Sequence, residues 1–185
     1  MISVVMPSYL GEYNNCASNR QEKLKRAIDS FLSQDIGELI VVADGCRDTL
    51  SICKHYPVNV IYLHEKRPLF SGELRNIGIK AAKYNYIAYL DSDDKFGNGH
   101  LQSIADNLDA DWLWWDDFVI NNKRTVELKQ SSIGTSAIAH KKELNVTWGD
   151  GYGHDWFFVC QLMKFNNKKI MANYQVMHVP GYFDE

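Results

Sequence analysis

The sequence predicts an α/β domain whose central sheet is mostly parallel and is flanked by helices. Four short apolar runs, rich in Val, Ile and Tyr and without alternation, are typical of strands buried on both faces. Helical patterns separate them, and strands that alternate with helices favour parallel pairing. The runs are ISVVM (2–6), LIVVA (39–43), VNVIYL (58–63) and YIAYL (86–90).

Three stretches carry apolar residues at helical spacing and predict the first helices, at 24–32, 74–81 and 101–108. From residue 111 the pattern changes. We expect a buried strand over 111–120, an antiparallel piece over 124–129, a helix over 154–165 and a last strand over 168–179. This second half is expected to complete the sheet and to close one side of a ligand site, without forming a separate domain.

Composition places the chain among ordinary globular proteins. Its 185 residues fit one domain, 1–185, and they are 45% hydrophobic and 23% charged. A net charge of −3 without a basic stripe gives no nucleic-acid signal. The four cysteines show no metal-binding or redox spacing, so we expect a reduced, cytoplasmic protein. No apolar run approaches the ~18 residues of a spanning helix, so any membrane association is expected to be peripheral.

Polar residues gather where the predicted strands end. The segments PSYLGEY (7–13), DGCRD (44–48), HEKRP (64–68) and DSDD (91–94) each follow one of the apolar runs. In open parallel sheets, ligands bind outside the carboxyl ends of the strands. The sequence therefore predicts one binding site along this rim.

Three acids within four residues, Asp91, Asp93 and Asp94, follow the last of these strands. One interpretation is a turn in which Asp and Ser side chains cap the next helix. The other is a site for Mg²⁺ or Mn²⁺, which take carboxylate oxygens and share their shell with substrate phosphates. A cation between these acids and a diphosphate would offset the repulsion that such a cluster creates.

Other polar residues also have a structural and a functional interpretation. Asp44 either shapes a turn or accepts a hydrogen bond from a nucleobase or ribose. Arg75 either lies on a solvated helix face or contacts a diphosphate. Asp155 either caps a helix or acts as a general base, and His178 is either structural or a metal ligand.

Taken in order, these segments resemble the nucleotide-sugar-dependent glycosyltransferases of family 2, which have the GT-A fold. The resemblance covers the chain nearly end to end. Six stretches carry it: SVVMPSY, AIDSFLSQ, ELIVVADGCRD, RNIGIKAA, YIAYLDSDD with its DxD motif, and GHDWFF followed by a later histidine. It implies a nucleotide-binding half over about 1–110 and an acceptor and catalytic half over about 111–185.

The resemblance also implies roles for individual residues. Asp155 would be the catalytic base, Asp93 and His178 would hold Mn²⁺ or Mg²⁺, and whether Asp94 is the closer metal ligand stays open. Gly134, Thr135 and Ser136 are candidates for hydrogen bonds to sugar hydroxyls. The donor site would comprise Pro7, Ser8, Tyr9, Asp44, Arg75, Asp91 and Ser92.

The implied reaction is a metal-dependent, inverting transfer of a sugar from a nucleoside-diphosphate sugar, UDP-linked by expectation, to a hydroxyl of a glycan or other acceptor. One departure is His154-Asp155, where relatives often show Glu-Asp. The other is size, so that a partner subunit or a homo-oligomer could supply acceptor-binding surface. Two alternatives remain at this stage: an inactive nucleotide-sugar-binding module, and a phosphatase of the haloacid dehalogenase type.

Overall fold

The computed structural model describes residues 1–67, 71–181 and 183–185, and Pro68 of the predicted rim segment lies outside them. Its centre is a seven-stranded sheet in which β9 alone runs antiparallel to its neighbours. The predicted α/β class and mostly parallel sheet are therefore confirmed. Across the sheet the strands are β10 (Asn167–Ile170), β6 (Trp112–Trp115), β9 (Ile138–Lys141), β4 (Tyr86–Tyr89), β1 (Ile2–Ser8), β2 (Glu38–Ala43) and β3 (Asn59–Tyr62).

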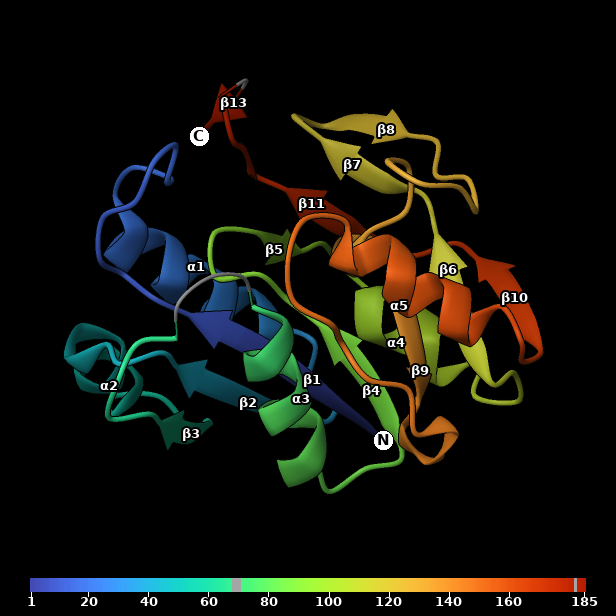
Figure 1. Ribbon diagram of the computed structural model, residues 1–185, viewed down its shortest axis with the longest axis horizontal. Coiled ribbons are helices and arrows are strands. Elements are labelled where there is room, and N and C mark those ends of the chain that lie inside the picture. Colours follow the sequence, from blue (N-terminus) through green and yellow to red (C-terminus); the bar gives the residue numbers. More distant parts are fainter. Residues whose placement is uncertain (68–70, 182) are drawn as a thin grey trace.

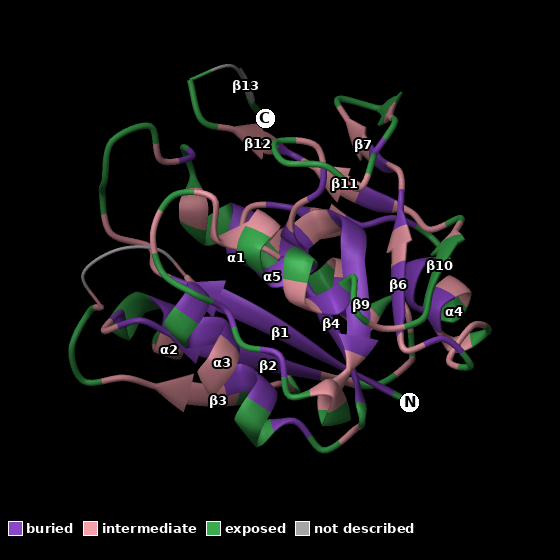
Figure 2. Cartoon of the chain, turned by 45° about the vertical axis from the view of Figure 1, so that its right-hand side comes forward, coloured by how far each residue is buried: buried purple, intermediate pink, exposed green. Residues whose placement is uncertain are grey.

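The four predicted strands of the first half are present. All residues of β1 and β4 are buried, and β2 is buried except at its first residue, as continuous apolar runs require. β3 differs from the expectation of burial on both faces, because it is an edge strand and its residues are only partly covered. Figure 2 shows the buried central strands beneath helices whose outer sides are exposed.

Helices cover both faces of the sheet (Figure 1). On one face, the turn after α1 contacts α4 through the Gln34 side chain, and α1 also packs on α2. On the other face, α3 and α5 are joined by the Arg75–His154 contact. Helix α2 was not among the predicted helices, because its seven residues are too few to show an amphipathic pattern. The helices are α1 (Arg20–Leu32), α2 (Arg47–Cys53), α3 (Gly72–Ala81), α4 (His100–Ala105) and α5 (His154–Leu162).

The second half completes the sheet as predicted, but its strands are divided differently. The expected strand over 111–120 is two strands, β6 in the main sheet and β7 (Asp117–Val119) in a second sheet. Asp116 lies between them, and its carboxylate pairs with Lys169 at 2.7 Å and accepts the Val126 N–H. A polar side chain bonded to β10 and to the segment after β8 marks the point where the chain changes sheets.

The second sheet lies beyond the carboxyl ends of the main strands. The antiparallel piece expected over 124–129 is instead β8 (Asn122–Arg124), which pairs with β7 after a turn where Ile120 and Asn121 have positive φ. The strand expected over 168–179 is broken into β10, β11 (Tyr174–Val176) and β12 (His178–Val179). The order of the second sheet is β5 (Lys95–Phe96), β11, β7, β8, and β12 pairs with β13 (Phe183–Asp184).

One hydrophobic core contains buried side chains from both halves of the chain, including Val5, Ile87, Trp112, Ile138 and Phe158. Within the described residues, no helix combines the length and apolar character needed to cross a membrane.

Candidate active site

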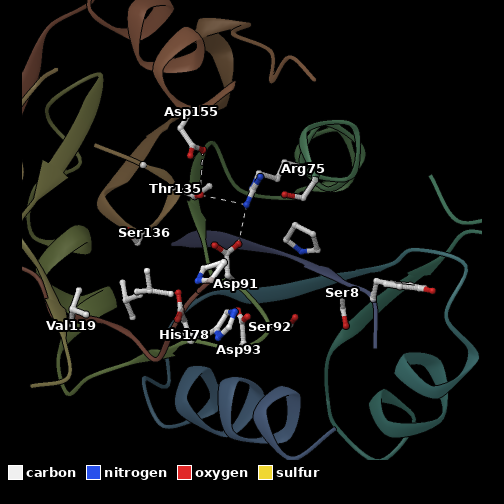
Figure 3. A pocket seen from close by; sticks show the side chains of 18 of the residues that line it. Ser8, Arg75, Asp91, Ser92, Asp93, Val119, Thr135, Ser136, Asp155 and His178 are labelled. Carbon is white, nitrogen blue, oxygen red and sulfur yellow. Dashed lines mark hydrogen bonds and ion pairs between the residues drawn. The ribbon is translucent and has the colours of Figure 1, made fainter. Parts of the chain in front are cut away.

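An open cleft of about 1060 Å³ runs along the carboxyl ends of β1, β2 and β4 and is closed by the second sheet and α5. Figure 3 shows side chains that point into it from these elements. The structure thus brings every site residue predicted from sequence to one cavity. Its lining includes Pro7, Ser8, Tyr9, Asp44, Arg75, Asp91, Ser92, Asp93, Asp155 and His178.

One end of the cleft is formed by β1, β2 and the loop after β3. The buried Asp44 accepts the Arg67 N–H at 2.7 Å, so its carboxylate fixes that loop over the end of β2. Gly45 makes this approach possible, because a Cβ there would lie 2.4 Å from the Lys66 nitrogen and φ is +63°. The Lys66 ammonium lies 4.7 Å from the Tyr9 ring centroid. This end therefore offers an aromatic face, a carboxylate and a cation.

Arg75, on α3, is the buried cation at the centre of the cleft and is only 3% exposed. Its Nη2 donates to Asp91 Oδ1 at 2.9 Å and lies 3.4 Å from Thr135 Oγ1 (Figure 3). Its guanidinium carbon lies 4.9 Å from the Trp148 ring centroid, a cation–π contact. Its Nε is buried without a hydrogen-bond acceptor in the described part of the chain. Packing on both sides holds this charge in place.

Asp91 and Asp93 form the acidic part of the cleft. Burial raises the pKa of Asp93, and the negative charge of Asp91 raises it further. The Arg75 guanidinium is paired with one oxygen of Asp91 and offsets its negative charge. Asp93 has no such partner among the described residues, and its repulsion from the Asp91 carboxylate costs free energy. Added positive charge would therefore stabilise this pair. Ser92, between them, also lines the cleft.

Asp94 has a different position from Asp93, although both belong to the acidic segment. Its Oδ1 accepts the Met177 N–H at 2.7 Å and its Oδ2 accepts the Tyr174 hydroxyl proton at 3.0 Å. Burial, followed by the charges of Asp93 and Asp91, raises the pKa of Asp94 well above its ordinary range. Asp94 anchors β11 beneath the cleft, and this geometry leaves Asp93 as the acid available to a ligand.

His178 lies beside the same acids, and its charge would lower the pKa of Asp93. Its Nε2 lies 3.0 Å from the Asn15 carbonyl oxygen and its Nδ1 lies 3.2 Å from Asp184 Oδ1. A metal ligand needs a free ring nitrogen. Nδ1 makes no hydrogen bond within the described residues, whereas binding through Nε2 would require the Asn15 contact to open.

The described residues contain no group of three His, Cys, Asp or Glu side chains arranged to hold a metal unaided. Mg²⁺ and Mn²⁺ sites that share substrate phosphates need only one or two carboxylates. Asp91 and Asp93 supply these, and their mutual repulsion is a reason for a cation to bind there. The acids therefore fit a divalent cation that is completed by ligand oxygens.

Asp155 faces Arg75 across the cleft from the first turn of α5, where the helix dipole favours a negative charge. Its Oδ1 accepts from the Thr135 hydroxyl at 3.4 Å, and its Oδ2 lies 3.5 Å from a Cβ built on Gly134. The side chain is 36% exposed. The carboxylate therefore contacts the Thr135 hydroxyl and the His154 ring and remains open to the cleft.

Trp148 and Thr135 organise this site in ways that the sequence did not predict. Trp148 packs flat on Phe158 with ring centroids 3.9 Å apart, and the Asn76 side chain bonds its backbone at both N–H and carbonyl. These contacts fix the Trp148 ring against the Arg75 guanidinium. Thr135 was a candidate for sugar contacts, but it also joins Arg75 to Asp155. Neither role has a local signal, because both depend on residues far away in sequence.

Comparison with protein families gives a match over most of the chain. The model of Glycosyl transferase family 2 matches residues 3–170. The Poly(ribitol-phosphate) beta-N-acetylglucosaminyltransferase TarP of Staphylococcus aureus is 30% identical over 178 residues, which are 92% of this chain and 50% of TarP. The chain thus spans about half the length of this relative.

Solved structures share the architecture at low sequence identity. S. aureus TarS matches with a TM-score of 0.76 at 19% identity, over 95% of this chain and 60% of that one. The mannosyltransferase PcManGT from Pyrobaculum calidifontis, solved with GDP-Man and Mn²⁺, matches with a TM-score of 0.72 at 13% identity, over 98% and 58%. These matches, together with the sheet described above, confirm the predicted GT-A fold.

Proposed function

Because the chain belongs to glycosyl transferase family 2, we propose that it transfers a sugar from a nucleoside-diphosphate sugar to an acceptor hydroxyl, with inversion at the anomeric carbon and with help from a divalent cation. Family membership argues against the phosphatase alternative, because phosphatases of that type carry their acidic motif after the first strand. Here Asp91 and Asp93 follow β4. The inactive binding module remains as the competing outcome of the test below.

The observation that carries this proposal is the continuous contact from Asp91 through Arg75 and Thr135 to Asp155. Asp91 and Asp93 lie where a donor diphosphate would meet a cation, and Asp155 lies across the same cleft. The Arg75 guanidinium is fixed between Asp91 and Asp155, and its charge favours a negatively charged group of a ligand beside it. The cleft therefore has a place for the leaving group and a base within one connected set of side chains.

The donor is proposed to carry uridine. TarS has been solved with UDP-GlcNAc and matches this chain with a TM-score of 0.73. PcManGT binds GDP-Man, so guanosine is the alternative. The base would bind at the end of the cleft formed by Tyr9 and Asp44, and the acceptor is proposed to be a hydroxyl of a glycan or polymer.

In the proposed reaction, Asp155 accepts the proton of the acceptor hydroxyl as its oxygen attacks the anomeric carbon. The bond from that carbon to the diphosphate oxygen breaks on the opposite face, so one displacement inverts the configuration. Arg75 places its charge beside the departing diphosphate. A cation bound by Asp91 and Asp93, with His178 as the proposed further ligand, would neutralise part of the diphosphate charge.

The test is release of nucleoside diphosphate from UDP-GlcNAc and a panel of other UDP- and GDP-sugars, with Mn²⁺ and soluble glycan acceptors. We expect release with one donor class and an inverted glycoside by NMR. A donor that binds but is never cleaved under any of these conditions would favour the binding module and reject the transferase proposal.

A further inference from the structure

His154, the first residue of α5, lies between two charged groups of the cleft. Its Nε2 is 3.4 Å from Arg75 Nη1 and 3.3 Å from Asp155 Oδ1. Its Nδ1 is 2.9 Å from the Gly151 carbonyl oxygen. The ring is 13% exposed and meets the Trp148 ring edge-on, with centroids 5.8 Å apart. One imidazole nitrogen therefore faces both the central cation and the proposed base.

The hydrogen-bonding capacity of these neighbours fixes where the protons lie. The Gly151 carbonyl only accepts, so Nδ1 of His154 carries a proton whether the ring is neutral or charged. In the neutral ring, Nε2 then has a lone pair, which can accept from Arg75 but not from a carboxylate. In the charged ring, Nε2 carries a proton, which Asp155 can accept and which repels Arg75.

We propose that His154 is a positioning residue for the proposed transfer, whose Nε2 accepts from Arg75 when the ring is neutral and donates to Asp155 when the ring is charged. The inference rests on the proposed function of this cleft and adds a residue that controls its two principal groups. In the neutral state, Arg75 is held by Asp91 and His154 together, and the Asp155 carboxylate is available as a base. In the charged state, the carboxylate is bonded to the imidazolium and is a weaker base.

The other groups around the ring support this assignment. Arg75 comes from α3, Asp155 from α5 itself, and the Gly151 carbonyl and Trp148 ring from the preceding loop. Asp91 is paired with Arg75 at 2.9 Å. Among the described residues, Nε2 of His154 therefore lies beside one cation and one carboxylate.

The direct test is a histidine titration followed by long-range ¹⁵N–¹H NMR, with the His154 signals identified from their loss in His154→Gln. We expect the neutral ring to carry its proton on Nδ1. Asp155→Asn removes a favourable negative charge and is expected to lower the titration midpoint of His154 by about one pH unit or more. Arg75→Gln removes a repelling charge and is expected to raise it.

An Nε2–H neutral tautomer, or a midpoint that does not move in Asp155→Asn, would overturn the inference. If Arg75→Gln fails to fold, Asp155→Asn alone decides it. His55, exposed after α2, provides the matched control, because its titration should be the same in all variants. This measurement needs no turnover, so its result is independent of whether the proposed function holds.

Kinetics give the second readout, using nucleotide release from the cleaved donor. For the wild type we expect turnover to fall in acid, as His154 gains its proton and engages Asp155. In His154→Gln this fall should move to lower pH by about one unit, whereas His55→Gln should retain it. An unchanged acid limb in His154→Gln would contradict the inference, because a merely structural role leaves the limb in place. Absence of release from every donor would instead reject the proposed function.

Discussion

Asp155→Asn is expected to reduce turnover by about 10²–10⁴-fold and to leave nucleotide binding nearly unchanged. The amide keeps the shape of the side chain and can still accept from Thr135, but it cannot take a proton from an acceptor hydroxyl. The side chain lies at the exposed end of α5, so the fold should tolerate the change. Nucleotide release and calorimetric binding of UDP-GlcNAc measure the two effects separately.

Asp150→Asn is the matched control for this variant. It removes the same charge from an exposed position on the loop before α5, and we expect full activity. Turnover by Asp155→Asn within about threefold of the wild type would show that another group takes the proton. Equal loss in both variants would show that the negative charge of this loop, and not the base, is what matters.

The second large effect is expected for Arg75→Lys, which keeps the charge but changes its shape. An ammonium group cannot contact Asp91, Thr135 and His154 together as the planar guanidinium does. Loss of one charge-assisted hydrogen bond is worth about 1.5–3 kcal/mol, so we expect donor affinity to fall about 10–100-fold and turnover to fall as well.

The control for that variant is Arg47→Lys, on the exposed first turn of α2. It should bind donor as the wild type does. Thermal melting of both proteins separates binding from stability. If Arg75→Lys bound and turned over the donor normally, Arg75 would be a structural ion pair for Asp91 only, and the proposed path from donor to base would be wrong.

The strands of the first half were predictable because their signal is local. A continuous apolar run such as 39–43 is stable in the middle of a sheet covered on both faces, and the polar rim follows from parallel pairing. The run 58–63 has the same composition but forms the edge strand β3, which its own sequence does not reveal. The convergence of Asp44, Asp91 and Asp155 on one cleft follows from that topology and from the order of the motifs.

Features that depend on distant partners were not predictable. The strand β9 has an ordinary composition and is defined by insertion between β4 and β6. The different positions of Asp93 and Asp94 are set by Tyr174 and by the Met177 backbone, which are 80 and 83 residues away from Asp94 in sequence. The placement of Trp148 under Arg75 is likewise a result of packing between α3 and the loop before α5.

The most direct test of a cation-assisted donor site is calorimetric titration of UDP, GDP, ADP and CDP into the wild type and Asp93→Asn, with Mn²⁺ or with EDTA. We expect that one nucleotide binds the wild type, that EDTA weakens this binding, and that Asp93→Asn loses the effect of Mn²⁺. Absence of binding by every nucleotide in both conditions would contradict this expectation.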